Sequence, residues 1–431
     1  MTTSRFLTLL WSLVAATALA TAAAMSPGSY DVFRTPKDVV LLIGCVAILA
    51  AGTAGALLSD EIARLFRRLP TAPVILALAA AAWTIVVSLA SLRPLASSWA
   101  PVTVICCVAF FCAAILTAGR HHLAALLVVL IPAVANAVLA ILQSTQTWYP
   151  WAVDPRVPAR LRTTALIGNP NDLGTYLVLP ALAAFAAALA WRRHRWLLIV
   201  AMLLVAGIAS AQSVTPFIGT AAGVFVMAFT SRTRALRIGI AVALVALIGA
   251  ALLHPGSRLR FQSLFETTST GDLPEMTSFR IMPAVTAIEM FRDRPLVGIG
   301  PGSFSALYMS YKNEMDEKHP QWVRLSNESF GQAHNDHLQI LAETGLPGYL
   351  MFIAALVLLA MVSFRRADAT NDADPKAQFA RIFAFPAAAC FAVLAIEQFP
   401  LQLTAPTVVA LYLAALCFAW APERSVADES R

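Results

Sequence analysis

The chain alternates long apolar runs with short polar segments along almost its whole length. Many of the runs contain about 17 to 25 residues, the length of an α-helix that crosses the ~30 Å hydrocarbon layer of a membrane. The pattern predicts helices over these ranges: 6–24, 39–58, 72–91, 100–118, 121–142, 172–190, 196–211, 215–230, 236–253, 345–364, 378–397 and 404–421. We therefore expect an all-α integral membrane protein with about twelve transmembrane helices.

The first apolar run has a second interpretation. It follows a single Arg5 and ends in small residues around Ala22 to Ala24, as a secretory signal peptide does. Because the run is long for a signal peptide, we interpret it as a retained helix. The orientation of the later helices is the same in both cases.

Basic residues are distributed unevenly between the two sides of the predicted bundle. With the N-terminus inside, more than half of the 31 Lys and Arg residues fall in cytoplasmic segments, and the short outward loops hold only Arg34, Lys37 and Arg93. This asymmetry is typical of membrane proteins and predicts that both termini are cytoplasmic. It also explains the net charge of +7 without a nucleic-acid partner.

Two outward segments, 143–171 and 254–344, are too long to be simple connectors. The larger one carries aromatic and aliphatic residues throughout and a helix-like stretch from Arg280 to Phe291, so we expect a helical domain in this loop. We therefore divide the chain into three parts. Residues 1–253 hold the first nine helices and the loop 143–171, and residues 254–344 form the large loop. Residues 345–431 hold the last three helices and a cytoplasmic tail.

The stretch 333–348 gathers two imidazoles, two side-chain amides and two carboxylates at the predicted outer end of the tenth helix. A histidine with a pKa near neutrality can take a proton from an attacking hydroxyl, so His334 is our candidate base. We expect Asn335, His337 and Glu343 to contribute to substrate binding. An interfacial histidine that only forms a hydrogen bond at a helix start is the simpler alternative.

A zinc site is another interpretation of this stretch. His334 and His337 are three residues apart and could share one face of a helix. The pattern is weak, because a third ligand would have to come from Glu328, Asp336 or Glu343. We therefore expect no metal.

Arg280 precedes a glycine-rich segment, 295–302, that includes Gly300. A guanidinium group binds phosphate oxygens through a fork of N–H donors, so an outward arginine beside such a turn suits a pyrophosphate. Contact with lipid headgroups or salt bridges within the loop is the alternative. Arg160 and Arg162 in the other outward segment offer further anion contacts, ahead of an Asn169-Pro170-Asn171 turn that is typical of a helix N-cap.

The block from His334 to Gly348 closely resembles the signature H-N-x-x-L-Q-x-x-x-E-x-G-x-x-G of the O-antigen ligase and polymerase superfamily of bacterial membrane proteins. The segment 295–302, Arg280 upstream of it, and Arg162 with the segment 168–171 match further blocks in the family's order. The resemblance spans roughly residues 155 to 350.

The resemblance implies a metal-independent, GT-C-like glycosyltransferase of the bacterial inner membrane with its active site in the periplasm. It would take a glycan from undecaprenyl pyrophosphate and pass it to lipid A-core in a ligase, or to another carrier-linked glycan in a polymerase. His334 would activate or position the acceptor hydroxyl, and Arg280 would hold the pyrophosphate leaving group. The resemblance implies no cofactor, since the donor already contains the activated phosphate bond.

One departure concerns the loop between the seventh and eighth helices. Ligases of the family carry a second catalytic arginine there, where this chain has Val214. Either Arg160 or Arg162 supplies that charge, or the chain is a polymerase or a divergent member. A small-anion transporter and a catalytically silent scaffold are the remaining alternatives, and Asn136 is the clearest polar residue in a predicted helix interior.

Overall fold

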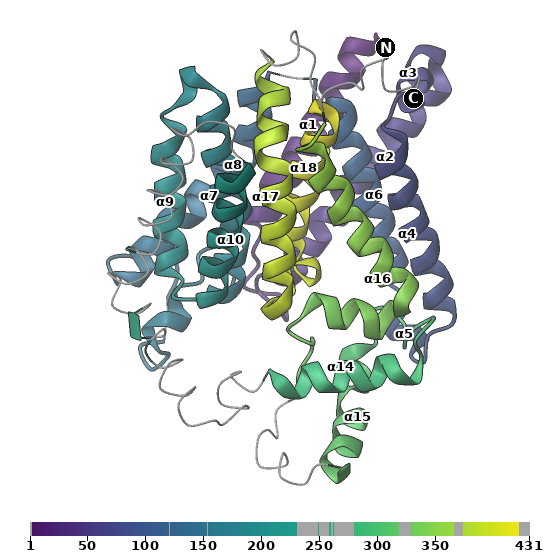
Figure 1. The fold of residues 1–431 in the computed structure, drawn as a ribbon, viewed down its shortest axis with the longest axis vertical. Helices are drawn as coiled ribbons and strands as arrows, with labels where there is room; N and C mark the ends of the chain where they lie inside the picture. The colour runs from purple at the N-terminus through teal and green to yellow at the C-terminus, as the bar shows by residue number, and fades with distance from the viewer. Residues whose placement is uncertain are drawn as a thin grey trace.

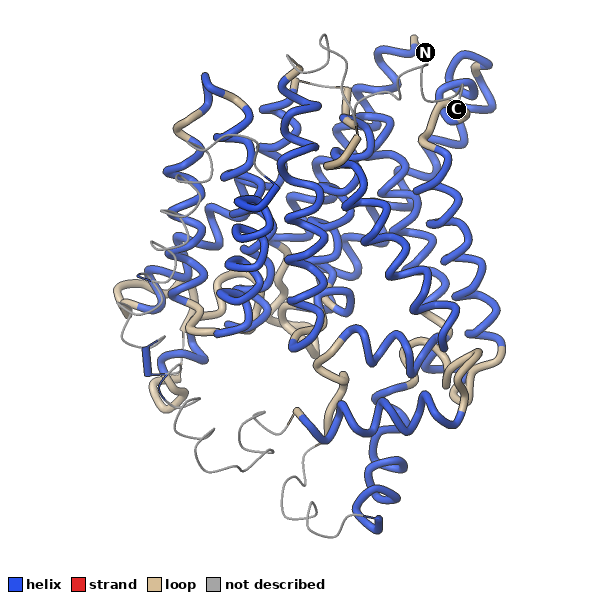
Figure 2. The backbone as a smooth tube through the Cα atoms, in the orientation of Figure 1, coloured by secondary structure: helices blue, strands red, loops and turns tan. Residues whose placement is uncertain are grey.

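The structure is a computed structural model of the 431-residue chain. It describes residues 2–119, 121–152, 154–230, 280–318, 329–365 and 374–421, together with Gly249, Arg258, Leu259 and Gln262. Figure 2 shows helices and loops throughout these residues. The fold is therefore all-α in the part that the structure describes, as the sequence predicts.

Eleven longer helices make up the described part of the bundle. They are α1 (Thr3–Ala23), α2 (Arg34–Leu58), α4 (Thr71–Leu89), α6 (Ala100–Thr117), α7 (His122–Ser144), α8 (Pro170–Ala190), α9 (Leu197–Ser210), α10 (Val214–Thr230), α16 (Asp336–Val362), α17 (Pro375–Glu397) and α18 (Thr404–Trp420). Shorter elements connect them: α3 (Asp60–Phe66), α5 (Pro94–Ser97), η1 (Ala159–Arg162), η2 (Arg192–His194) and η5 (Pro400–Gln402). Two further helices, α14 (Ile281–Asp293) and α15 (Phe304–Lys318), form the helical domain expected in the large loop.

Within the described residues, eight helical stretches are long and apolar enough to cross a membrane, and α9, α10 and α18 are shorter apolar helices. The chain is a multi-pass membrane protein. Gly249 apart, the helix predicted over 236–253 lies outside the described residues, as do most of 254–279 and Glu328. The count of about twelve transmembrane helices therefore stays a prediction.

The two ends of the bundle carry different elements (Figure 1). At one end, which we call the cap end, lie α14 and α15. At the opposite end lie α3, η2 and the start of α17, which are described segments predicted to be cytoplasmic. The structure thus separates the two sets of loops as the charge pattern predicts, and the side of the membrane that each end faces stays a prediction.

Helix α8 is the central element of the core. It packs against α7, α9, α10, α17 and α18, and nearly all of its residues are buried. Its sequence is rich in alanine, which lets neighbouring backbones approach closely in a membrane, where packing replaces the hydrophobic effect between helices. A similar close approach occurs in α9, where a Cβ on Gly207 would lie 2.7 Å from the Cβ of Ala137. The core therefore fixes the cap ends of these helices relative to one another.

Two helices begin earlier than the hydrophobic pattern predicts. Helix α2 begins at Arg34 instead of 39, because its first turn carries Lys37 and Asp38, which the pattern assigns to a loop. Helix α16 begins at Asp336 instead of 345, so the predicted start is wrong and His337 and Glu343 lie on the helix. The predicted start at residue 345 coincides with a real feature, because the helix is interrupted at Gly345.

Gly345 has φ +69° and ψ −176°, a conformation that is essentially confined to glycine. The break lets a segment that follows α14 pair with the backbone of α16. The amide of Leu346 donates to the carbonyl oxygen of Pro295 at 2.8 Å, and the amides of Ile299 and Gly300 donate to the carbonyl oxygens of Ala342 and Glu343 at 2.9 and 3.0 Å. This backbone ladder attaches the helical domain to the bundle.

Replacing Gly345 with alanine is expected to destabilise the cap end. The alanine would adopt a conformation that costs about 1–3 kcal/mol, and its Cβ would lie 2.3 Å from the carbonyl oxygen of Leu296. The melting temperature of the purified protein in detergent measures the effect. Gly119→Ala is the matched control, because a Cβ there meets nothing within 4 Å, and equal melting temperatures for the two variants would contradict the role of the break.

Candidate functional site

His334 lies in a short loop that its own neighbours hold in place at the cap end. The side chain of Asn335 accepts a hydrogen bond from the amide of Leu338 at 2.9 Å and caps α16. The side chain of Gln339 accepts from the amide of Ala333, also at 2.9 Å. His334 has φ +52°, in the left-handed region that non-glycine residues rarely adopt. The backbone of the candidate base is therefore fixed from both sides.

The ring of His334 is surrounded by aromatic side chains. Its centroid lies 4.8 Å from that of Phe399 and 5.8 Å from that of Phe330, in both cases edge to face. Phe399 is positioned by the buried Asp336, whose carboxylate accepts a hydrogen bond at 2.8 Å from the amide of Leu401 in η5. The Nδ1 atom of His334 is buried and has no hydrogen-bond partner among the described residues.

The surroundings keep the imidazole neutral. The pKa of His334 is lowered to about 4, first by burial and then by the positive charges of Arg280 and Arg34. Both guanidinium groups therefore lie within electrostatic range of the ring. At neutral pH one ring nitrogen retains its lone pair and can accept a proton.

Arg280 lies at the start of α14, as the sequence predicts, and is held by the end of α17. Its Nη1 donates to the backbone oxygen of Glu397 at 3.2 Å and lies 3.9 Å from the Glu397 carboxylate. The same carboxylate accepts a hydrogen bond from the hydroxyl of Thr215 in α10. Because the side chain of Glu397 is 53% exposed, the ion pair borders open space at the cap end.

Arg34, which the sequence analysis places in a short outward loop without a role, belongs to the same cluster. Its Nη2 forms an ion pair at 3.1 Å with Asp172 in the first turn of α8. Its guanidinium carbon lies 5.7 Å from the ring centroid of Phe399, which in turn contacts His334. The sequence carries no signal for this arrangement, since Arg34 and Asp172 are far apart along the chain.

Arg160 contacts the loop in which the sequence analysis expects the missing arginine. Its Nε donates at 3.1 Å to the carbonyl oxygen of Gln212, in the loop between α9 and α10. Its Nη2 donates at 2.6 Å to the side chain of Asn171. Arg162 lies apart from these contacts, with its guanidinium carbon 5.9 Å from the ring centroid of Tyr149. Of the two predicted alternatives, Arg160 is thus the residue at the loop.

Three other predicted binding residues have contacts within the protein. His337 lies 3.0 Å from the carbonyl oxygen of Ala392 and 3.3 Å from the hydroxyl of Tyr349. Glu343 is buried and accepts from the amide of Phe304 at 3.1 Å. The amide of Gly300 is part of the backbone ladder. These contacts give the three residues a structural role in the loop and the ladder. Their roles in substrate binding, and that of Asn335, stay predictions.

The two imidazoles of the zinc interpretation do not share a helical face. His334 precedes α16, whereas His337 lies in its first turn and contacts Tyr349 and Phe352. Within the described part of the chain, no group of three or more His, Cys, Asp or Glu side chains is arranged to hold a metal ion.

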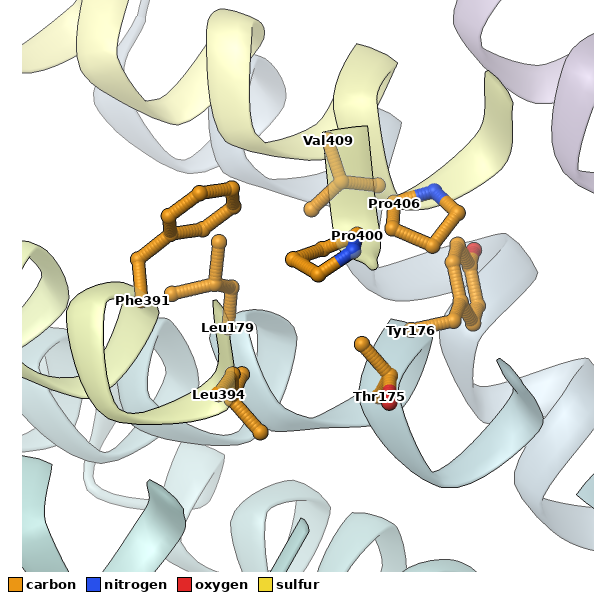
Figure 3. A pocket seen from close by; sticks show the side chains of 8 residues that line it. All are labelled: Thr175, Tyr176, Leu179, Phe391, Leu394, Pro400, Pro406 and Val409. Carbon is orange, nitrogen blue, oxygen red and sulfur yellow. The ribbon is translucent and has the colours of Figure 1, made fainter. Parts of the chain in front are cut away.

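An apolar pocket lies between α8, α17, η5 and α18 (Figure 3). Side chains such as Leu179, Phe391 and Val409 point into it, and Thr175 and Tyr176 supply its hydroxyl groups. The pocket lacks charged side chains, so we interpret it as the packed support of η5 and not as a binding site for phosphate or sugar.

A second cavity, of about 200 Å³, opens beside Arg34. It is polar, and the residues that line it are Arg34, Lys37, Asp38, Ile167, Asp172, Gln332, Gln402, Leu403, Thr404, Ala405 and Pro406. Gln332 lies two residues before His334, so the cavity and the candidate base share one loop. No local sequence pattern reveals this cavity, because four segments that are far apart along the chain build it.

Comparison with known proteins finds one matching family. Residues 199–353 match a family model described as O-antigen ligase. The matched range contains both Arg280 and His334, and Arg34 and Arg160 lie outside it. No curated protein matches the chain.

The pKa of His334 is expected to rise when Arg280 is replaced by glutamine, because one of the two positive charges that lower it is removed. Burial is the larger cause, so the pKa should stay below the ~6.5 of an exposed histidine. NMR titration of ring-labelled histidine measures it. An unchanged pKa would place Arg280 outside the range of His334.

The same lowered pKa affects stability. Because the unfolded chain binds a proton at His334 more tightly than the folded chain does, the free energy of unfolding should fall as the pH drops from about 6.5 to about 4. His334→Asn should remove this contribution, since asparagine tolerates the left-handed backbone and does not titrate.

Proposed function

Because residues 199–353 belong to the O-antigen ligase family, we propose that the chain transfers a glycan from a lipid-linked pyrophosphate to an acceptor hydroxyl. The donor carrier is undecaprenyl pyrophosphate, and the acceptor is lipid A-core at the periplasmic face of the bacterial inner membrane. The observation that carries the proposal is the geometry around Phe399 at one end of a membrane bundle. The ring of His334 packs against Phe399, Arg34 lies 5.7 Å from the same ring, and Arg280 is held by Glu397, two residues before Phe399.

In the proposed reaction, the acceptor oxygen attacks the anomeric carbon of the donor sugar. The new glycosidic C–O bond forms as the bond from that carbon to the pyrophosphate oxygen breaks. His334 accepts the proton of the acceptor hydroxyl, and undecaprenyl pyrophosphate leaves with the bonding electron pair. A base that is neutral before the reaction has the protonation state this step requires.

Arg280 stabilises the leaving group in this proposal. Negative charge develops on the bridging phosphate oxygen as the bond breaks, and a positioned guanidinium stabilises such charge. In the free protein the partner of Arg280 is the partly exposed Glu397. The diphosphate takes the place of that carboxylate, so Arg280 remains paired in both states.

Arg160 provides the second positive charge of the proposed pyrophosphate site. It reaches the loop between α9 and α10, which includes Gln212 and Ser213, from η1. This location corresponds to the loop in which the family's ligases carry their own arginine. A contact from outside the loop therefore supports a ligase in spite of Val214.

Replacement of His334 by asparagine should abolish transfer while the protein remains folded and inserted. Asparagine tolerates the left-handed φ of this position, so the variant removes the base without adding backbone strain. The measurement is the surface polysaccharide of a deletion strain that carries the variant gene, with the wild-type gene as the control. Full restoration of polymer by the variant would remove the base assignment.

The deletion strain also separates the two activities within the family. If the deleted gene encodes a ligase, lipid A carries no polymer and carrier-linked long chains accumulate. If it encodes a polymerase, single repeats are attached to lipid A. We expect the first outcome, and the second would replace the ligase by a polymerase with the same donor chemistry.

Arg280→Lys should impair transfer although it retains the positive charge. An ammonium group cannot reproduce the forked contacts of guanidinium with phosphate oxygens, and loss of one such contact costs about 2–3 kcal/mol, or roughly 30- to 150-fold in rate. The transfer rate in membranes measures the effect. Arg292→Lys is the matched control, because Arg292 is exposed on the same helix and pairs with Glu289. An unchanged rate for Arg280→Lys would leave Arg280 as an anchor to lipid headgroups.

A further inference from the structure

We propose that the polar cavity beside Arg34 is the subsite that binds a sugar ring of the acceptor, with Gln332 as a residue that determines acceptor specificity. The assignment of this sugar ring to the acceptor rests on the proposed function. The chemistry of the cavity, which indicates a neutral sugar, is independent of that function.

The charges of the cavity lining are balanced. The two positive side chains, Arg34 and Lys37, are matched by two carboxylates, Asp38 and Asp172. Arg34 and Asp172 form an ion pair. The ammonium group of Lys37 is already saturated, since it donates to the carbonyl oxygens of Ala24, Phe33 and Leu166 at 2.7 to 3.0 Å. A phosphate in this cavity would face two carboxylates without an unpaired cation, so a neutral ligand fits better.

The polar groups of the cavity suit hydroxyl groups. Carboxylate oxygens accept hydrogen bonds, guanidinium donates them, and side-chain amides do both, as a polyhydroxylated ring requires. The side-chain amides of Gln332 and Gln402 form no hydrogen bond with the described part of the chain. They are therefore available to a ligand.

The size of the cavity limits the ligand. About 200 Å³ is less than the roughly 300–1,000 Å³ of pockets for drug-sized molecules. The cavity therefore holds one sugar ring and not an oligosaccharide. The rest of a glycan would extend from it into the open space at the cap end.

The position of the cavity favours the acceptor over the donor sugar. The base must contact the acceptor hydroxyl, and Gln332 and His334 lie on the same loop. The donor's phosphates are placed by Arg280, which is held on a different element by Glu397. Phe399 connects the cavity to the base, because Arg34 of the lining lies over its ring and the ring of His334 packs against it. A sugar ring in the cavity would therefore lie beside the base and not in the proposed diphosphate site.

The test measures binding of small probes to the purified full chain in detergent by saturation-transfer NMR. The probes are methyl glucoside and methyl galactoside for a neutral sugar, inorganic pyrophosphate for the leaving group, and glucose 1-phosphate for a donor-like sugar. Gln332→Trp fills the cavity from a loop. Leu95→Trp is the matched control, because Leu95 is 90% exposed on α5 at the same end of the bundle.

At least one methyl glycoside is expected to bind the wild-type chain. Gln332→Trp should weaken that binding by about tenfold or more, which corresponds to about 1.4 kcal/mol, and Leu95→Trp should not change it. Pyrophosphate and glucose 1-phosphate should bind with affinities that depend on Arg280 and not on Gln332.

Three results would overturn the proposal. They are the absence of glycoside binding to the wild-type chain, equal glycoside binding by Gln332→Trp, and displacement of the glycoside by pyrophosphate. If Gln332→Trp also weakens the binding of glucose 1-phosphate, the cavity holds the donor sugar and the acceptor assignment is wrong. Loss of pyrophosphate binding in Arg280→Gln supports the proposed function in each of these cases, so the two ideas fail separately.

Discussion

The interruption of α16 at Gly345 is the constraint on which the cap end depends. A continuous helix would use the backbone groups of residues 342–346 internally, and the segment after α14 would have no partner. With the break, that segment forms a ladder of backbone hydrogen bonds with α16. The ladder attaches α14, and with it Arg280, to the same helix whose first turn follows His334. Two groups that lie far apart in the sequence are thereby connected to one element.

Most of the polar side chains in the stretch 333–348 form hydrogen bonds with the backbone. Asn335 caps the helix, Gln339 holds the amide of Ala333, and Glu343 holds the amide of Phe304. Each satisfies a backbone donor that would otherwise be buried without a partner. His334 is the exception, because its Nδ1 has no such partner among the described residues. A motif of this kind thus places one reactive group by using several unreactive ones.

The sequence alone predicts the helices well, because their apolar length is a local property. It also names His334, Arg280 and Arg160 as candidate site residues, and their roles stay predictions. It misses Arg34 and Glu397, since the value of a charged residue at a helix end depends on what faces it across the bundle. Arg34 meets Asp172 of α8, and Glu397 meets Arg280 of α14. Such pairs are set by packing of the whole bundle, which no local pattern encodes.

The low pKa of His334 creates a difficulty for a base, because a weakly basic imidazole takes up a proton reluctantly. The proposed substrates remove part of that difficulty. The two positive charges that lower the pKa come from Arg280 and Arg34, and a diphosphate bound to Arg280 brings negative charge to the same place. An opposite charge nearby favours the protonated imidazole and raises its pKa. The base would therefore gain proton affinity only when the donor is present, which limits proton uptake by the free protein.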